Sequence, residues 1–233
     1  MTDAELGEST EMGLGDSHPS ELMSVSIASL GPSGWRSRDV LAFARIVDTS
    51  PLCTIGKDSR TTLTPFHSLV GSVIAQQVSV RAADSITQNL HDKMEGKITA
   101  GRIVKAPEDE LRSVGLSGAK TETIKGLAHA VRTGVLDLEK ALTHPDDSAV
   151  VAELTKLWGI GWGTAEMFLM FTMHRLDVWP TGDLALRKGW NIIQRTGGDI
   201  DPKTLEPLGD PLRPYRSVVA WYRWRAVAGG NSS

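Results

Sequence analysis

The sequence predicts an all-α protein, and three observations support this prediction. Apolar residues recur at positions i, i+3 and i+4 in one segment after another, which is the spacing of a buried helix face. The breaks between these segments are short and contain proline, glycine and capping residues. Segments in which apolar and polar residues alternate, as in a half-buried strand, are scarce.

The first predicted helix follows two segments of different character. Residues 1–21 contain six acids and no Lys or Arg, and their few large apolar groups cannot offset the entropy of ordering, so we expect a disordered acidic tail. Met23 to Leu30 is either a short strand or irregular. Ser37 then opens a helix that ends before Pro51. Residues 22–64 are expected to pack against the C-terminal part of the chain.

The next helix begins at Pro65, where the missing N–H has no cost, and its apolar stripe extends to Ile74. It leads into Gln76 and Gln77, two long amides before a predicted helix cap at Ser79. Further helices are predicted over residues 82–90, 107–114, 119–132, 148–157, about a dozen residues after 161, 184–195, a short stretch after 202, and 215–228.

The length and composition limit the class of protein. A chain of 233 residues with 40% hydrophobic content forms one ordinary domain or two small lobes that share a cleft. A single cysteine, Cys53, cannot build a disulfide framework or a four-cysteine zinc or iron–sulfur site, and indicates a reducing compartment. No apolar run approaches the roughly 18 residues that span a membrane. The N-terminus lacks signal-peptide character, so we expect a cytoplasmic protein without a membrane partner.

The charge is unevenly distributed along the chain. The net charge is −3, but removing the six acids of the tail from the total of 28 leaves 22 acids against 25 bases. The segment from Pro211 to Arg225 contains four arginines and no acid. Such a segment is either a solvated face or part of a nucleic-acid-binding surface.

A glycine turn, Gly159-Ile160-Gly161, joins two predicted helices. Backbone N–H groups and the helix dipole at the start of the second helix can bind a phosphate there. The dinucleotide fingerprint GxGxxG is excluded, because Thr164 replaces its third glycine and the preceding element is helical. A plain turn between antiparallel helices is the alternative.

A lone carboxylate, Asp183, follows a Pro-Thr-Gly loop and precedes the helix that begins at Leu184. An aspartate in this position commonly caps a helix. The spacing of one helix and one loop from the glycine turn can also bring Asp183 back toward the bound phosphate. Asp177, before an apolar stretch, is predicted to be structural. Most of the seven tryptophans should form core or cleft wall, and the histidines show no ligand spacing.

These residues together resemble the AlkA-type 3-methyladenine DNA glycosylases of the helix-hairpin-helix superfamily. The resemblance extends from about Pro65 to Ala228 in the order of the family's motifs. These motifs are Gln76-Gln77-x-Ser79, Gly115-Leu116-Ser117, Leu157-x-Gly159-Ile160-Gly161-x-x-Thr164-Ala165, Asp177-Val178-x-Pro180-x-x-Asp183, and Arg213-Pro214-Tyr215-Arg216-Ser217 through Trp224-Arg225.

The resemblance implies two helical lobes with a cleft between them and no N-terminal sheet domain. Residues 65–175 would form one lobe, with the helix-hairpin-helix at about 150–173, and residues 176–230 the lobe that carries Asp183. The implied function is monofunctional hydrolysis of the N-glycosidic bond of alkylated bases of the 3-methyladenine type, after the nucleotide is flipped out of the duplex. The implied partner is double-stranded DNA with damaged bases, bound by a monomer in the bacterial cytosol.

The resemblance also implies a role for each site residue. Asp183 would stabilise the cationic sugar and orient water. Gln77, with Gln76 beside it, would enter the gap left by the flipped nucleotide. The implied base pocket consists of Trp224, Gly163, Met167 and Trp162. The implied phosphate-binding residues are Gly159, Ile160, Gly161, Gly163 and Thr164. The implied cation ligands, for Na⁺ or K⁺, are the carbonyls of Thr155, Leu157 and Ile160. No other cofactor and no iron–sulfur cluster is implied.

The hairpin departs from the family pattern Gly-Ile-Gly-x-Trp-Thr-Ala. Here the aromatic residue, Trp162, comes one place earlier, and Gly163 occupies the pocket position. Adjacent helical residues are about 100° apart, so Trp162 should not replace the missing ring and the pocket should be more open. Bifunctional relatives place a Schiff-base lysine at the position of Gly163, so no lyase activity is expected. Two alternatives stay open: a non-catalytic DNA-binding module, and a glycosylase for oxidised or mismatched bases.

Overall fold

The structure is a computed structural model that describes residues 37–55 and 63–230, and within these ranges it contains helices and no strands. The all-α prediction is therefore confirmed. The predicted acidic tail and the segment from Met23 to Leu30 lie outside the described residues. The helices are α2 (Ser37–Thr49), α3 (Pro65–Ala75), α4 (Val80–Lys93), α5 (Ala100–Lys105), α6 (Glu108–Ser113), α7 (Gly118–Thr133), α8 (Leu138–Leu142), α9 (Asp147–Leu154), α10 (Trp162–Phe171), α11 (Leu184–Gln194), α12 (Pro202–Leu205), the 3₁₀ helix η1 (Pro207–Leu212) and α13 (Arg216–Gly230).

The helices begin where the capping residues predict. Pro65 is the first residue of α3, and the Thr64 hydroxyl before it accepts the backbone N–H of His67. The predicted cap Ser79 accepts the N–H of Ala82 and starts α4. Each cap satisfies a backbone donor that the first helical turn leaves without an intrahelical partner.

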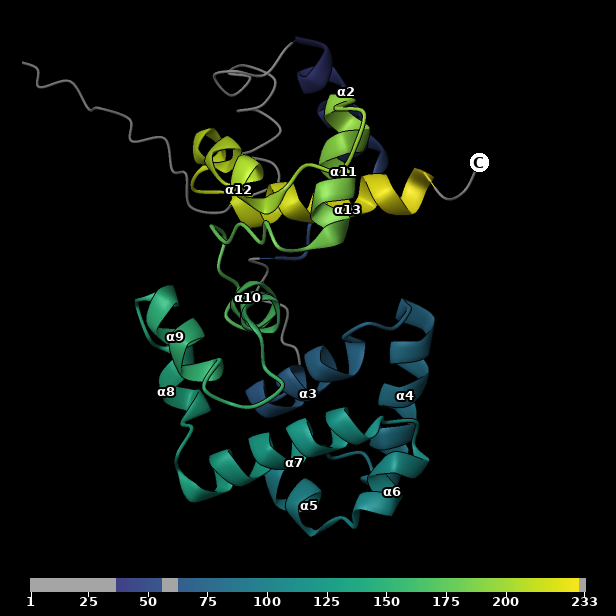
Figure 1. Ribbon diagram of the computed structural model, residues 1–233, viewed down its shortest axis with the longest axis vertical. Helices are drawn as coiled ribbons and strands as arrows, with labels where there is room; N and C mark the ends of the chain where they lie inside the picture. Colours follow the sequence, from purple (N-terminus) through teal and green to yellow (C-terminus); the bar gives the residue numbers. More distant parts are fainter. Residues whose placement is uncertain (1–36, 56–62, 231–233) are drawn as a thin grey trace, which may run out of the picture.

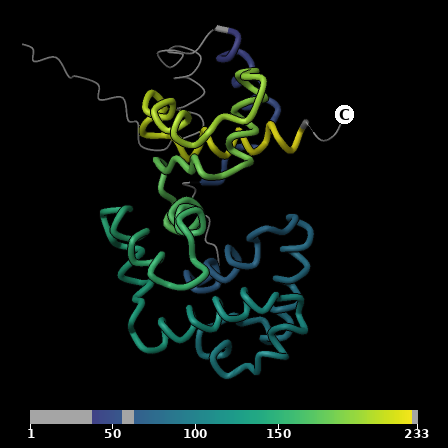
Figure 2. Tube along the Cα trace, in the orientation of Figure 1, coloured from purple at the N-terminus to yellow at the C-terminus, as the bar shows by residue number. Residues whose placement is uncertain are grey.

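Figure 1 shows two helical lobes, one above the other. In the lower lobe, α7 contacts α3, α5 and α6, and α10 packs on α3 and α9 at the level of the junction between the lobes. In the upper lobe, α11 and α13 pack closely together and both contact α2. The trace in Figure 2 shows that α2, which precedes the whole lower lobe in sequence, lies among the C-terminal helices.

The crossing of α11 and α13 depends on Gly189. A Cβ atom on this residue would lie 2.3 Å from the carbonyl oxygen of Arg223 in α13, closer than any side chain tolerates. The absence of a side chain therefore lets the two helix backbones touch. This contact fixes the position of α11, which starts after Asp183, relative to α13, which contains Trp224.

The connection between the lobes is bonded to the start of α13. The Ser217 hydroxyl donates to the carbonyl of Arg175 at 2.8 Å and accepts the N–H of Val178 at 2.9 Å. Asp177 forms ion pairs with Arg213 at 2.6 Å and with Arg216 at 2.7 Å. The prediction that Asp177 is structural is confirmed.

The basic segment from Pro211 to Arg225 is not one continuous surface. Arg216 is buried against Asp177. Arg223 is fully buried, with its guanidinium 4.0 Å from the ring centre of Trp190, and burial lowers its pKa to about 9. Both interpretations of this segment, as a solvated face and as a nucleic-acid-binding surface, are therefore wrong for Arg216 and Arg223.

Three short elements, α5, α8 and η1, were not predicted. They have five or six residues, too few for an apolar repeat to become visible. The predicted helix at 148–157 ends earlier, at Leu154, because the chain turns there. Trp179, Trp190 and Trp221 lie in the core, as predicted for most tryptophans. Within the described ranges, no helix is long and apolar enough to cross a membrane.

Candidate active site

The turn between α9 and α10 requires a glycine at position 159. Gly159 has a φ of +79°, in the left-handed region that residues with a side chain rarely adopt. A Cβ atom there would lie 1.9 Å from the hydroxyl oxygen of Thr123 in α7. The backbone of the turn therefore packs directly against Thr123 of α7, in the lower lobe.

The start of α10 is open on the side of the turn. Gly161 is its N-cap residue and provides no side-chain hydrogen bond to the first turn. A Cβ atom on Gly161 or Gly163 would meet nothing within 4 Å. The N–H groups of a first helical turn lack intrahelical acceptors and lie at the positive end of the helix dipole. This geometry suits an anion such as a phosphate.

The two glutamines after α3 have different surroundings. The side-chain amide of Gln76 donates to the carbonyl of Gly159 at 3.1 Å and to the hydroxyl of Thr164 at 2.9 Å. Gln77 is exposed and has a φ of +55°, which is uncommon for a residue other than glycine. Gln76 thus joins the end of α3 to the hairpin. Gln77, in contrast, is exposed, and its backbone is constrained.

Asp183 is both a helix cap and a pocket residue. Its Oδ1 accepts the N–H of Leu186 at 2.6 Å and the indole N–H of Trp224 at 2.8 Å. The cap interpretation is correct, and it does not compete with a chemical role, because the same carboxylate also lines the pocket described below. Oδ1 accepts both hydrogen bonds, so they hold the carboxylate in one orientation. The direction of Oδ2 is thereby also set.

Trp224 contacts Asp183 and is not among the residues that line the pocket. Its ring stacks on Phe171 of α10, with ring centres 5.9 Å apart and planes inclined by 27°. The resemblance implies a wall of the base pocket at this position, and that role stays a prediction. In the structure Trp224 holds the carboxylate in place and joins the two lobes.

A pocket of about 860 Å³ lies where the end of α3, the start of α10 and the start of α11 meet. Predicted wedge, pocket and catalytic residues line it together: Gln76, Gln77, Trp162, Gly163, Met167 and Asp183. Predicted phosphate-binding residues also line it: Gly159, Gly161 and Thr164. Ile160, the remaining member of the predicted phosphate-binding turn, is buried. Segments about 80 residues and 20 residues apart in sequence therefore form one cavity.

Glu166 is a pocket residue that the sequence reading missed. It is 8% exposed and lies one turn after Trp162, whose indole N–H donates to its Oε1 at 3.2 Å. Burial raises the pKa of Glu166 to about 7; the Trp162 hydrogen bond opposes this shift, and the charges of Glu206 and Asp183 add to it. A lone acid within the apolar sequence of α10 was the signal that could have identified it.

The proposed cation ligands belong to the same turn. The carbonyl of Leu157 accepts the N–H of Ile160 at 3.1 Å, and Thr155 is the C-cap residue of α9. A carbonyl oxygen has two lone pairs, so this hydrogen bond is compatible with binding a cation. Among the described residues, no group of three His, Cys, Asp or Glu side chains could hold a metal ion. The carbonyl site therefore stays a prediction.

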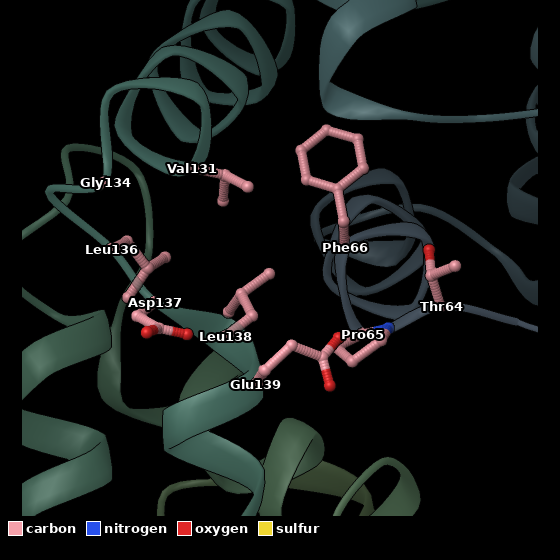
Figure 3. A pocket seen from close by; sticks show the side chains of 9 residues that line it. All are labelled: Thr64, Pro65, Phe66, Val131, Gly134, Leu136, Asp137, Leu138 and Glu139. Carbon is pink, nitrogen blue, oxygen red and sulfur yellow. The ribbon is translucent and has the colours of Figure 1, made fainter.

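A separate crevice of about 250 Å³ lies between the start of α3 and the end of α7 (Figure 3). Its lining includes Phe66, Leu138 and Asp137, and the Asp137 carboxylate caps α8 by accepting the N–H of Lys140. None of the predicted site residues lines this crevice. The chemistry that the sequence predicted is therefore concentrated at the junction of the lobes.

The fold and the pocket define a two-lobed helix-hairpin-helix protein with a fixed carboxylate opposite the hairpin. A family model described as "HhH-GPD superfamily base excision DNA repair protein" matches residues 70–214, which is more than half of the chain. The chain belongs to this superfamily. The matched range ends before α13, so the helix that contains Trp224 lies beyond it.

The comparisons with individual proteins agree with this assignment. DNA-3-methyladenine glycosylase 1 of Schizosaccharomyces pombe is 26% identical over 163 residues, which cover 69% of this chain and 72% of the relative. The structure of the S. pombe 3-methyladenine DNA glycosylase Mag1 with abasic DNA matches with a TM-score of 0.74 at 24% identity, covering 87% of this chain and 94% of Mag1. A DNA-3-methyladenine glycosidase from Bacillus halodurans matches with a TM-score of 0.69 at 27% identity, covering 92% of each chain.

Proposed function

We propose that this chain is a monofunctional DNA glycosylase of base excision repair that releases alkylated bases of the 3-methyladenine type. The observation that supports this most strongly is the shared pocket, in which the hairpin, Gln77 and Asp183 meet. Membership of a base excision repair superfamily and the names of the relatives agree with it. The proposed substrate is double-stranded DNA, and the proposed enzyme is a monomer of the bacterial cytosol.

The hairpin and Gln77 would perform the binding step. The N–H groups at the start of α10 would bind a phosphate of the damaged strand, with the adjacent carbonyls of Thr155, Leu157 and Ile160 holding a monovalent cation. Gln77 would fill the gap in the duplex, and its constrained backbone would keep it in place. Gln76 is hydrogen-bonded to the hairpin and would hold Gln77 at a constant distance from the phosphate-binding start of α10.

Asp183 would perform the chemical step. Cleavage of the N-glycosidic bond develops positive charge on the sugar, and a preplaced carboxylate stabilises this charge. The indole of Trp224 fixes the orientation of that carboxylate. An alkylated purine leaves as a neutral molecule because it is cationic before the bond breaks. Gly163 has no amine, so the sugar would be attacked by water and no Schiff base would form.

The test is the variant Asp183→Asn, which preserves the size and capping capacity of the side chain. We expect base release from methylated duplex DNA to fall by about 1000-fold. Affinity for a duplex with an abasic site should stay within about threefold, because phosphate contacts are unchanged. Asp137→Asn, at a helix cap remote from the pocket, is the matched control.

Undiminished release by Asp183→Asn would overturn the assignment of Asp183. A native protein that binds duplex DNA yet releases no base from any alkylated substrate would instead be a DNA-binding module. Release of oxidised or mismatched bases in preference to alkylated ones would establish the other alternative.

A further inference from the structure

Glu166 is a buried acid to which the proposed function assigns no role. It lies on α10, between the pocket residues Gly163 and Met167, and lines the same pocket as Asp183. Its Oε1 accepts the indole N–H of Trp162. Glu166 is only 8% exposed and yet lines the cavity, so a base bound in the pocket would lie close to it.

Among the residues that the structure describes, no basic group shifts the pKa of Glu166. The charged groups that act on it are two acids, Glu206 after α12 and Asp183 at the start of α11. Helix α3 contributes the neutral residues Ser72, Ala75 and Gln76 to the shared pocket, and the ionisable residues of α3 and α9, namely His67, Asp147 and Glu153, do not perturb it. A carboxylate in such surroundings is costly, and burial together with the two neighbouring acids raises the pKa of Glu166 to about 7.

We propose that Glu166 is the general acid of this pocket, donating the proton on its Oε2 to the flipped base as the N-glycosidic bond breaks. The inference rests on the proposed function and deepens it by assigning the substrate range. A cationic alkylated base departs without a proton. An uncharged base departs as an unstable anion unless an acid protonates it. Glu166 therefore extends the reaction to uncharged damaged purines.

The step balances as a hydrolysis. The electron pair of the bond between C1′ and the base nitrogen leaves with the base, and the proton of Glu166 neutralises it. The oxygen of a water molecule adds to C1′, and the proton that this water loses passes to solvent. Glu166 then recovers its proton from solvent. Asp183 supplies the negative charge beside the sugar, so the two carboxyls have separate roles, as in other glycoside hydrolysis.

The experiment compares two leaving groups in the same duplex, 7-methylguanine as the cationic base and hypoxanthine as the uncharged base. Glu166→Gln keeps the acceptor for Trp162 but has no transferable proton. We expect it to slow hypoxanthine release by about 100-fold and 7-methylguanine release by less than about threefold. For the native enzyme, hypoxanthine release should fall as the pH rises through about 7, because the protonated form of Glu166 is the active one.

Two neighbouring variants should move the midpoint of this pH profile in opposite directions. Trp162→Phe removes the hydrogen bond that lowers the pKa of Glu166, so the midpoint should rise. Glu206→Gln removes a negative charge that raises this pKa, so the midpoint should fall. Glu139→Gln, an exposed acid on α8 that lines the separate crevice, is the matched control and should leave the midpoint unchanged.

The outcomes separate this inference from the proposed function. Equal slowing of both bases by Glu166→Gln, or of neither, would overturn the general-acid role and leave the glycosylase assignment intact. A native enzyme that releases only 7-methylguanine would also overturn it, since Glu166 would then have no base to protonate. A native protein that releases neither base would overturn the proposed function, and this inference with it. An unchanged thermal unfolding midpoint of Glu166→Gln would exclude misfolding as the cause of slowing.

Discussion

Two helices begin at the pocket, and their first turns differ in one respect. The N-cap residue of α10 is Gly161, which offers no side chain to the first turn. The N-cap residue of α11 is Asp183, whose Oδ1 accepts the N–H of Leu186. The first end presents backbone N–H groups and partial positive charge, whereas the second presents a carboxylate. The capping residue thus determines whether a helix start at this pocket presents open backbone N–H groups or a carboxylate.

Each helix start is held by a side chain from a different helix. Gln76, at the end of α3, bonds to the carbonyl of Gly159 and to Thr164 beside the start of α10. Trp224, from α13, bonds to Asp183 at the start of α11. The comparison teaches that both ends are positioned by tertiary contacts, and the following substitutions test this.

The largest expected effect on the start of α10 is that of Gly159→Ala. The new Cβ atom would collide with Thr123 and would occupy a left-handed backbone position. We expect the free energy of unfolding to fall by about 3 kcal/mol in urea denaturation. Gly161→Ala, where a Cβ atom meets nothing within 4 Å, should change it by less than about 1 kcal/mol. Equal losses in both variants would contradict the role assigned to α7.

Trp224→Phe tests whether the hydrogen bond from Trp224 positions Asp183 at the start of α11. The substitution keeps an aromatic ring against Phe171 and removes the N–H that binds Asp183. Because hydrogen bonds to charged groups contribute about 2 kcal/mol, single-turnover base release should slow by about 30-fold. Release at the native rate would show that the hydrogen bond from Trp224 is not needed to position Asp183.

The smallest expected effect is a difference in stability between two variants of Asp183, which separates its role as the cap of α11 from the role of its charge. Serine caps a helix about as well as aspartate, whereas alanine does not. Asp183→Ser and Asp183→Ala both remove the carboxylate that binds Trp224 and should both abolish base release, but the alanine variant should be about 1 kcal/mol less stable than the serine variant because it also loses the cap. Thermal and urea unfolding of the two variants measure the difference. Equal stability would mean that the bond to Leu186 contributes nothing.

Much of the fold could be predicted because it depends on local signals. Caps at Ser79 and Asp183 and the proline at Pro65 mark helix starts in the sequence, and the structure has helices at each. The short elements α5, α8 and η1 give too few residues for a periodic pattern. The arginines of α13 could not be interpreted from composition, because burial of Arg223 on Trp190 depends on how α11 crosses α13.

Sequence reasoning named most of the residues that line the candidate site, but it could not predict the contacts between them. Spacing identified Asp183 and the glycine turn, but not that Gln76 would bond to the hairpin. The role of Trp224 in the base pocket stays a prediction, and the sequence did not show that its indole would bond to Asp183, because that contact follows from the packing of α13. Glu166 was missed because burial, the main cause of its raised pKa, depends on how other segments pack around α10.

The sequence by itself determined that the chain is helical, where most helices begin, and which turn and which carboxylate hold the candidate chemistry. These properties depend on residues close together in the chain, through caps, glycine conformations and the helical repeat. Only the tertiary structure decided that Gly189 lets α11 touch α13, that Gly159 must fit against Thr123, and that Glu166 shares a cavity with Asp183. Burial and charge at those positions come from segments distant in sequence, and no local pattern records them.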